Sequence, residues 1–330
     1  MKNRFLLLAI MVLGVGGRVA AQHEGHHGAG HKYAAGAKLS TANDTAAQML
    51  TVRVGPLRLP AHTDHMAATQ ARDQVLAIPF DGWITAYHPR LTDGKGNTLP
   101  GRMLHHVAFW NSGRPDFLCP NKEEHIFGAG GEMNDWPALA GFGYRVRRGE
   151  RIRVNTMFHN PTDTSYPEVF IEVKMEYQRA GKGAELKSVY PVWFDVQQCG
   201  DSGYDLKPGK NVTTGKFGMG YNGVLLGVGG HMHDFGRRLV LARAGQKGTI
   251  ATLEPKTDPG GRLISMPIVT FADRGGLALA RGEVLEVTAA YDNRSGEHLR
   301  QGAMGIVVGY FVPAEDRQLA GLRRGKKAGG

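Results

Sequence analysis

The sequence predicts an all-β fold made of two tandem β-sandwich domains, and three observations carry this prediction. The 330 residues include 47 Gly and 16 Pro and few long apolar helical runs, which favours short strands joined by turns. A single core rarely grows past about 250–300 residues, so a chain of this length is expected to form two domains. The stretch from Arg281 to Tyr310 repeats, without a gap, the pattern of Arg148 to Tyr177, which predicts two copies of one sandwich unit.

The first residues have the pattern of a secretory signal. A basic start at Met1–Arg4 precedes the apolar run Phe5–Val15, and Ala20 and Ala21 offer a cleavage site, so residues 1–21 are predicted as a signal peptide. The apolar run is too short to span a bilayer, and no other stretch approaches a transmembrane length. We therefore expect a secreted or periplasmic protein without a transmembrane segment.

Both ends of the mature chain are expected to be disordered. Residues 22–48 form a His-rich leader, which either collects metal for a site elsewhere or is a flexible polar segment. Residues 314–330 form a basic tail and hold part of the net charge of +10. No nucleic-acid motif accompanies this charge and an exported protein rarely meets nucleic acid, so we expect no nucleic-acid partner. Attraction to an anionic envelope surface is the alternative.

The chain has two cysteines, Cys119 and Cys199. In an oxidising compartment an isolated pair usually forms a disulfide, which stabilises a fold by roughly 4 kcal/mol in the chain-entropy model. Two free thiols or a thiolate metal ligand are the alternatives.

The first domain is predicted over residues 49–200. Apolar residues alternate at strand period over residues 49–60. Two short apolar segments, Gln74–Phe80 and Trp83–Tyr87, are separated by the hairpin signal Asp81-Gly82. These patterns indicate successive strands and turns.

The predicted strand Met103–Trp110 contains the pair His105 and His106. Neighbouring residues of a regular strand point to opposite faces, so both imidazoles can bind one metal only if the strand twists or bulges there. In a regular strand one of the two has no part in a site.

The second domain is predicted over residues 201–313 from the repeat. Each copy reads as a turn, a strand, a turn at Asn, and a closing strand. When the two copies are aligned, His159 corresponds to Asp292, and Met304 corresponds to Ile171. The two copies therefore differ at positions that carry metal-ligand side chains, a difference that core packing does not demand.

The motif Gly229–Gly236 contains His231 and His233, two positions apart. On an extended segment this spacing places both imidazoles on one face, where they can grip a metal. A lone His-x-His pair is weak evidence, since one His can cap a strand edge while the other is exposed. Further donors elsewhere in the chain add weight, and imidazole together with thioether suits copper better than magnesium or calcium, which prefer oxygen. These donors are His105, His106, His159 and Met304.

With these residues in place, the chain resembles the type II copper, ascorbate-dependent monooxygenases, the group of peptidylglycine α-hydroxylating and dopamine β-monooxygenases. The resemblance covers about Leu57 to Pro313 and rests on the order and separation of the suspected ligands. Within it, Met103–Trp110, Gly141–Arg151 and His159–Thr162 are more similar to the stress-upregulated nodulin-like proteins.

The resemblance implies two jelly-roll-like sandwiches with a cleft between them and two copper ions. His105, His106 and His159 would hold a first, electron-storing copper. The second copper, where oxygen is activated, would be held by the catalytic residues His231, His233 and Met304. The alternatives are a core methionine at Met304 and a hydrogen-bonded core histidine at His159.

The sequence departs from the peptide-amidating relatives at the substrate side. Where they carry a substrate-binding arginine before the His-x-His pair, this chain has Gly229, and where they carry a tyrosine after the Met it has Val308. An amidated peptide is therefore a poor substrate candidate. The segment Glu132–Trp136 either lines the cleft or is a surface turn. Asp234 is expected only as a neighbour of the ligands.

Two classes of function remain. The first hypothesis is an exported copper-dependent monooxygenase that hydroxylates a small substrate with dioxygen and a reductant such as ascorbate. The second is a non-catalytic copper-binding protein of the cell envelope, and a zinc-structural role comes third because a thioether is a poor zinc ligand. Serine-hydrolase and phosphate-loop motifs are absent from the sequence. Five other histidines are expected to have no metal role, because only His62 and His65 among them have a metal-type spacing and that pair lies in a polar, turn-like stretch: His62, His65, His88, His125 and His298.

Overall fold

The computed structural model describes residues 32–315 except 133–134 and 247. The predicted signal peptide, the first part of the His-rich leader and nearly all of the basic tail lie outside the described residues. Within the described part the chain forms strands and two short 3-10 turns, η1 (Gly101–Met103) and η2 (Ala272–Arg274). The predicted all-β fold is confirmed. No helix in this part is long and apolar enough to cross a membrane.

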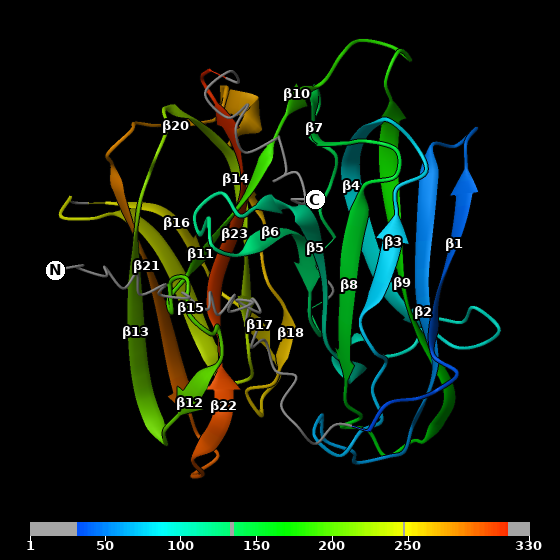
Figure 1. The fold of residues 1–330 in the computed structure, drawn as a ribbon. Helices are drawn as coiled ribbons and strands as arrows, with labels where there is room; N and C mark the ends of the chain where they lie inside the picture. Colours follow the sequence, from blue (N-terminus) through cyan, green and yellow to red (C-terminus); the bar gives the residue numbers. More distant parts are fainter. Residues whose placement is uncertain (1–31, 133–134, 247, 316–330) are drawn as a thin grey trace, which may run out of the picture.

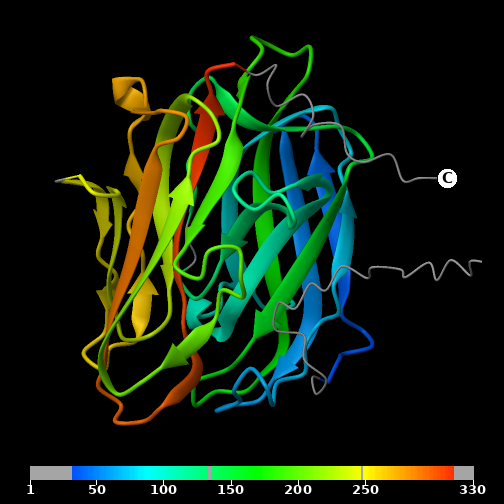
Figure 2. The same ribbon diagram turned by 60° about the vertical axis from the view of Figure 1, so that its left-hand side comes forward.

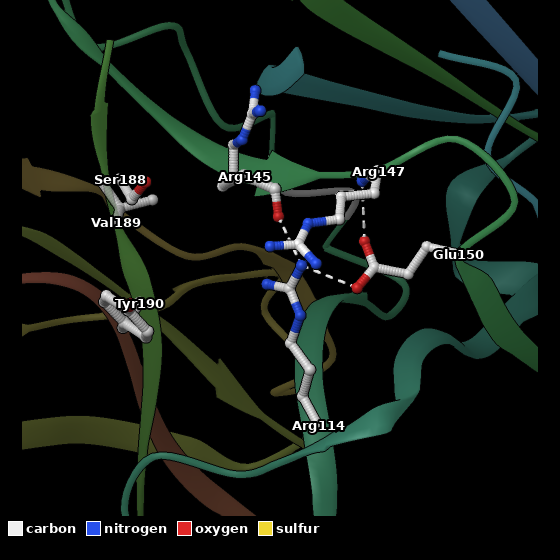
Figure 3. Close-up of a pocket in the computed structure, with 7 residues that line it drawn as sticks. All are labelled: Arg114, Arg145, Arg147, Glu150, Ser188, Val189 and Tyr190. Carbon is white, nitrogen blue, oxygen red and sulfur yellow. Dashed lines mark hydrogen bonds and ion pairs between the residues drawn. The ribbon is translucent and has the colours of Figure 1, made fainter. Parts of the chain in front are cut away.

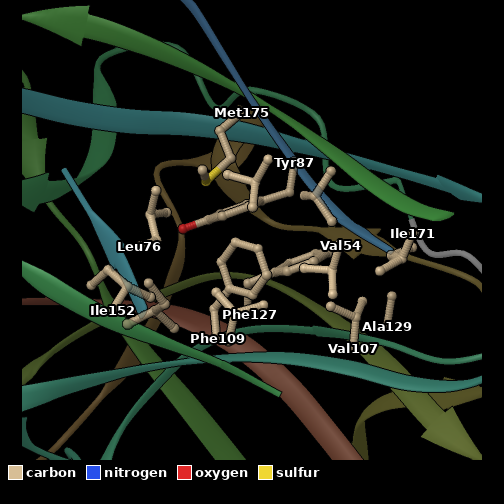
Figure 4. Close-up of a cluster of buried hydrophobic side chains, with 14 of the residues drawn as sticks. Val54, Leu76, Tyr87, Val107, Phe109, Phe127, Ala129, Ile152, Ile171 and Met175 are labelled. Atoms are coloured by element: carbon tan, nitrogen blue, oxygen red, sulfur yellow. The ribbon is translucent and has the colours of Figure 1, made fainter. Parts of the chain in front are cut away.

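The N-terminal half contains two sheets. The larger sheet has six strands in the spatial order β1 (Lys38–Asp44), β2 (Met49–Leu59), β9 (Tyr166–Arg179), β4 (Gly82–Thr92), β7 (Phe142–Val146) and β10 (Lys187–Ser188). The smaller sheet has the order β3 (Gln74–Ala77), β8 (Arg151–Phe158), β5 (Leu104–Pro115) and β6 (Glu123–Ala129). Their inner faces share one core, in which Tyr87 stacks on Phe127 while Phe109 meets that ring edge-on (Figure 4).

The C-terminal half repeats this plan. One sheet has the order β11 (Tyr190–Asp195), β23 (Gly305–Pro313), β14 (Gly223–Met232) and β19 (Val269–Thr270), with β20 (Leu277–Leu279) also on β14. The other has the order β13 (Gly209–Gly218), β21 (Val284–Asn293), β15 (Gly236–Arg243) and β16 (Thr249–Leu253). Two small ribbons complete it, formed by β12 (Tyr204–Leu206) with β22 (Leu299–Ala303) and by β17 (Lys256–Thr257) with β18 (Leu263–Ser265).

The two halves stand side by side and are packed together (Figures 1 and 2). Leu226 of β14 belongs to the buried core of the N-terminal half, and Val308 and Tyr310 of β23 pack against the same core. In the other direction, Phe117 and Cys119 belong to the C-terminal core. The outer face of the β14–β23 sheet is therefore an apolar interface between the halves.

The repeated stretch occupies equivalent strands in the two halves. β8 lies between β3 and β5, and β21 lies between β13 and β15. Val154 of β8 and Val287 of β21 are both buried, with 1% and 0% of their surface exposed. Tyr177 and Tyr310 lie on β9 and β23, the strands paired with β4 and β14.

Two predicted boundaries differ from the structure. The leader predicted to be disordered up to residue 48 contains β1, which pairs along its length with β2. Six of the seven residues of β1 are exposed, so its sequence shows no apolar pattern typical of a strand. Backbone hydrogen bonds to the edge of the sheet hold β1 in place. The division between the halves falls between Val189 and Tyr190, since β11 pairs with β23 of the C-terminal half. The sequence alone places this division at residue 200, because the residues of β11 do not reveal which strand it pairs with.

The two cysteines form the predicted disulfide. Cys119 and Cys199 are joined, with their Cα atoms 5.6 Å apart. The bond ties the loop after β5 to the segment after β11, and so it links the two halves. A disulfide is compatible with the predicted export.

Candidate metal centre

A β-bulge brings His105 and His106 to the same side of β5. The register between β5 and β8 shifts between Leu104 and His106, so His105 is the extra residue of the bulge. The ring centres of His105 and His106 are 5.4 Å apart, and the ring planes meet at 83°. The irregularity that two adjacent histidines need in order to share a metal is therefore present.

His159 lies directly after β8, beside this bulge. Its backbone N–H donates to the carbonyl of Met103 at 3.0 Å, which ties it to the segment that precedes β5. Its ring centre is 5.8 Å from the ring centre of His105. The structure thus brings together the three histidines predicted for the first site.

His231 and His233 lie at the end of β14, next to β23. The register pairs His231 with Ile306 and Met232 with Gly305, and the next step places His233 opposite Met304. Directly opposed residues, and residues two apart on a strand, share a face of the sheet, so His231, His233 and Met304 share one face. The two rings are 5.5 Å apart, and 8% of the Met304 surface is exposed.

The hydroxyl of Tyr291 ties His233 to Met304. It accepts hydrogen bonds from the backbone N–H of His233 at 3.0 Å and from that of Met304 at 3.2 Å, and it donates to the carbonyl of Met304. Tyr291 lies on β21, in the opposite sheet of the same half, and is buried. One buried hydroxyl therefore fixes the backbone at two of the three predicted second-site residues.

Gly236 completes this turn because a side chain there has no room. A Cβ atom at this position would lie 3.0 Å from the sulfur of Met232 and 3.1 Å from the carbonyl oxygen of His233. The glycine that ends the His-x-His motif thus lets the chain turn tightly from β14 into β15.

The two predicted ligand sets meet in one cluster. The rings of His105 and His233, one from each half, have centres 5.4 Å apart and planes at 86°. A further histidine, His65, has its ring centre 4.7 Å from that of His105, at 73°. We use the name histidine cluster for His65, His105, His106, His159, His231 and His233.

Most ring spacings in the histidine cluster fall in the range expected for two imidazoles on one metal. An imidazole nitrogen binds a metal at about 2.0–2.1 Å, which places the centres of two rings on one metal roughly 4.5–5.5 Å apart. Four of the five spacings lie between 4.7 and 5.5 Å, and the spacing of His105 and His159, at 5.8 Å, lies just beyond the range. Among the described residues no three His, Cys, Asp or Glu side chains converge on one point as the ligands of a bound metal do.

Burial keeps the central imidazoles neutral. Burial lowers the pKa of His105 well below its ordinary value of 6.5, and the neighbouring His233 and His106 lower it further. Burial also lowers the pKa of His159, against a raising effect of its hydrogen bond to the Arg102 carbonyl. Both residues are therefore neutral at pH 7, as an imidazole must be to donate its lone pair to a metal.

Three histidines of the cluster have one ring nitrogen fixed by an oxygen atom. The Nδ1 of His231 donates to Glu132 at 2.9 Å, the Nε2 of His106 to the side-chain oxygen of Asn155 at 2.7 Å, and the Nε2 of His159 to the carbonyl of Arg102 at 2.5 Å. Such an acceptor holds the proton on one nitrogen and leaves the lone pair on the other for a metal.

Glu132 is a buried carboxylate supplied by the N-terminal half to a histidine of the C-terminal half. Its side chain is 1% exposed, and its Oε1 also accepts from the backbone N–H of Gly130 at 3.0 Å. Burial alone would lower the pKa of His231, but the Glu132 carboxylate outweighs burial and raises it. A Cβ at Gly130 would lie 2.6 Å from Glu132 Oε2 and 2.8 Å from His231 Cε1, so only glycine fits beside this pair.

The two departures from the peptide-amidating pattern face each other. Gly229 of β14 pairs with Val308 of β23. A Cβ at Gly229 would lie 2.7 Å from the ring of Trp136, which is 5% exposed. Trp136 therefore occupies the space that a side chain at position 229 would need. It is buried against Tyr310 between the two halves, so it is not part of a surface turn.

The remaining histidines make other contacts. His62 pairs with Asp163 at 3.0 Å, His298 pairs with Asp205 at 3.1 Å, and His88 lies between Asp135 and Glu176. His125 stacks between Trp110 and Trp193. Asp234 is exposed and accepts from the backbone N–H of Leu263 at 2.8 Å.

Sequence reasoning expected no metal role for His65, gave Glu132 only as part of a segment that either lines the cleft or is a surface turn, and did not single out Tyr291. His65 has no ligand spacing to any other histidine of the cluster, and its loop is held in place by the bonds of Gln70 to Phe158 and of Thr63 to Asn160. Its nearest histidine in sequence, His62, turns outward. The His-x-His motif could have prompted a search for a buried carboxylate that orients a ligand histidine. The position of such a carboxylate in the chain follows no rule, however.

Two further cavities share no residue with the histidine cluster. One of about 70 Å³ is lined by Arg114, Arg145 and Glu150, and there the Arg114 guanidinium binds Glu150 at 2.7 Å and the carbonyl of Arg145 at 2.9 Å (Figure 3). The other, of about 1100 Å³, is an open groove between the halves. Their lining residues offer no metal-ligand set.

The comparisons with known proteins point to copper. The probable copper-dependent oxygenase M1 of Phoma sp. is 22% identical over 249 residues, which cover 69% of this chain and 63% of that protein. The probable copper-dependent oxygenase clz3 of Cochliobolus lunatus is 22% identical over 232 residues, which cover 64% of this chain and 72% of that protein. The match thus spans less than two thirds of the length of M1. At this identity the chain is related to copper-dependent oxygenases, and nothing finer follows.

No protein-family model matches the chain. Among solved structures, the glycosylasparaginase PNGase F from Flavobacterium meningosepticum has a TM-score of 0.40 at 9% identity, over 81% of this chain and 96% of that one. The major capsid protein P2 from bacteriophage PM2 has a TM-score of 0.34 at 9% identity, over 80% and 98%. Likenesses at this level carry no argument about function.

Proposed function

We propose that this protein is an exported copper-dependent monooxygenase that hydroxylates a small substrate with dioxygen and a reductant such as ascorbate. The observation that carries the proposal is the close approach of the two ligand sets, because half-buried imidazoles from both halves lie side by side. The buried Met304 is one step beyond the last β14–β23 pair, opposite His233. The two relatives named as copper-dependent oxygenases support the choice of metal and of reaction class.

The donor set fits copper better than other metals. Imidazole serves both Cu(I) and Cu(II), and the soft thioether of Met304 favours Cu(I). Magnesium and calcium prefer oxygen ligands, and a thioether is a poor ligand for zinc. In the proposal, one copper is held by His105, His106 and His159, and a second, catalytic copper is held by His231, His233 and Met304.

Bound copper would supply one-electron redox chemistry and a place for dioxygen to react. The chain's own residues supply the rest. Glu132 holds the proton on His231 Nδ1, so that Nε2 is the nitrogen with the lone pair, and Tyr291 fixes the backbone beside His233 and Met304. Burial keeps His105 and His159 neutral and therefore able to bind a metal cation.

The substrate side favours a small molecule without a carboxylate anchor. Gly229 and Val308, which pair across β14 and β23, carry no charge, and Trp136 fills the space next to Gly229. A substrate held by an ion pair at this place would need a cation that neither position provides. A substrate smaller and less charged than a peptide end fits better.

One experiment separates this proposal from the alternative, a copper-binding protein without catalysis. The purified protein is loaded with copper, its metal content and EPR spectrum are measured, and oxygen uptake is followed after ascorbate is added. Two coppers per chain and uptake that increases with a panel of small organic substrates support the monooxygenase. Bound copper without substrate-dependent oxygen uptake supports the copper-binding protein. The predicted His-rich leader is the sequence feature that suggests this alternative. A protein that binds no copper contradicts both.

A further inference from the structure

His65 lies closer to His105 than any other histidine of the cluster does. Their ring centres are 4.7 Å apart, inside the roughly 4.5–5.5 Å expected for two imidazoles on one metal. The planes meet at 73°, so the rings do not stack face to face. His65 is half-buried and comes from the loop between β2 and β3, a different element from those that carry His105, His106 and His159.

The loop that carries His65 is fastened to the strand end that carries His159. Thr63 and Asn160 exchange backbone hydrogen bonds, with N–H to carbonyl distances of 2.9 and 2.7 Å. Asn160 directly follows His159, so this bridge aligns the two histidine-bearing segments. The position of His65 beside the cluster is therefore built into the backbone.

A buried glutamine fixes the backbone at His65 itself. The side-chain amide of Gln70 donates to the carbonyl of His65 at 2.9 Å and to the carbonyl of Phe158 at 2.8 Å, while its oxygen accepts from the N–H of Phe158 at 2.8 Å. Gln70 is 2% exposed. A buried side chain with every polar group bonded holds its partners firmly, so the loop is pinned to the end of β8, next to His159.

We propose that His65 is a fourth imidazole of the N-terminal metal set, binding the metal together with His105, His106 and His159. This inference rests on the proposed copper function, and it adds a ligand from an element that the sequence pattern did not connect to the site. Four nitrogen donors suit the tetragonal geometry of Cu(II), whereas three imidazoles serve both oxidation states. His65 would therefore stabilise Cu(II) at this set more than Cu(I).

The chain offers a matched control for a test of His65. His62 lies three residues earlier in the same loop, has a side chain that is 68% exposed, and pairs with Asp163 outside the histidine cluster. His65→Gln and His62→Gln remove the same imidazole from the same segment. Both variants are made in the full chain with His231→Ala, so that the second metal set is weakened and the N-terminal set dominates the signal.

The readouts are the Cu(II) dissociation constant from chelator competition, the EPR spectrum of bound Cu(II), and the shift of the melting temperature when Cu(II) is added. With His65→Gln we expect a loss of Cu(II) affinity of tenfold or more, a changed EPR spectrum and a smaller thermal shift, while His62→Gln matches its parent. Equal melting temperatures of the metal-free proteins show that the fold is kept. If that condition fails, His65→Asn replaces His65→Gln.

The possible outcomes separate the inference from the proposed function. If the parent protein binds copper and both variants bind it equally well with the same spectrum, His65 is not a ligand, and the copper proposal stands without it. If the parent binds no copper, the proposed function fails and the assignment of His65 fails with it.

Discussion

His105 and His233 stand with their ring centres 5.4 Å apart, although one lies on β5 of the N-terminal half and the other directly after β14 of the C-terminal half. The spacing equals that between His105 and its own neighbour His106. The two ligand sets predicted from the sequence are therefore adjacent, because the outer face of the β14–β23 sheet packs against the N-terminal core.

This contact predicts that two Cu(II) ions bound to the two sets influence each other. Since the His105 ring contacts residues of both sets, ions held there would be close enough for their unpaired spins to couple. We expect the EPR spectrum of the fully loaded protein to be broadened, or weaker per copper, relative to a His231→Ala variant that fills only the N-terminal set. A loaded spectrum equal to the sum of two independent signals would show that the metals lie apart.

The hydroxyl of Tyr291 gives a second prediction. Tyr291→Phe removes the group that binds the backbone of both His233 and Met304 and leaves the ring in place. Loss of a buried hydrogen-bonding group costs about 1–3 kcal/mol of stability, so the fold should survive. We expect weaker copper binding at the set of His231, His233 and Met304, measured by chelator competition, with the N-terminal set unchanged.

Tyr204→Phe is the control for Tyr291→Phe, because Tyr204 packs edge-on against the Tyr291 ring in the same core and makes no contact with the ligands that the structure records. If both variants bind copper like the parent, the Tyr291 hydroxyl stabilises the fold but does not organise the metal set.

The internal repeat was accessible from the sequence because the same residue type has the same role in both copies. Asn160 and Asn293 occupy equivalent positions, and each side chain makes the same pattern of bonds. In both, the amide nitrogen donates to three backbone carbonyls and the oxygen accepts from the backbone and hydroxyl of the residue two places on, with partners at Leu59, Pro60, Thr164 and Thr162 in one copy and at Leu206, Lys207, Glu297 and Ser295 in the other. A buried turn of this kind demands Asn, so both copies keep it.

The composition of the site was only partly accessible. The spacing of His231 and His233 and the order of the other suspected ligands are sequence properties, and the structure brings the five suspected histidines together. Glu132 bonds to a histidine of the other half, and the loop that carries His65 is held at the cluster by the bonds of Gln70 to Phe158 and of Thr63 to Asn160. These bonds join segments far apart in the chain, which no local pattern encodes. The strand β1 was missed for the same reason, since its partner, not its own residues, makes it a strand.

Glu124 predicts a pH dependence of stability outside the metal centre. Burial raises the pKa of Glu124 from 4.5 to about 7, although the nearby Arg114 lowers it. The folded state then holds a proton that the unfolded state has released, so this group's contribution to stability is lost as the pH rises from about 4.5 to about 7. Glu124→Gln should make the free energy of unfolding less dependent on pH in that window, measured by urea titration at several pH values.

The control for Glu124→Gln is Glu168→Gln, which changes an exposed carboxylate of β9 and should leave the pH profile of the parent unaltered. Parallel profiles for the parent and Glu124→Gln would mean that the carboxyl at position 124 is ionised in both the folded and the unfolded states across this range.

Met304 carries the prediction that bears most directly on the enzyme. Its backbone N–H and carbonyl are both bound by Tyr291, and its surface is 8% exposed, so the side chain can change while the strand stays in place. Met304→Leu conserves volume and should cost less than about 1.5 kcal/mol of stability. Loss of the soft thioether should weaken Cu(I) binding at the set of His231 and His233, while Cu(II) stays bound by the imidazoles.

The test compares Met304→Leu with Met219→Leu, a buried methionine of the C-terminal core that has no place in the histidine cluster. Cu(I) affinity is measured by competition with a Cu(I)-specific chelator, Cu(II) affinity by EPR titration, and oxygen uptake with ascorbate as reductant. We expect a steep loss of Cu(I) affinity and of oxygen uptake for Met304→Leu alone, because the sulfur is the only soft donor in the set. If Met304→Leu and Met219→Leu behave alike, Met304 is a core residue, the second set is a two-histidine metal clip, and copper binding without catalysis becomes the better account of the protein.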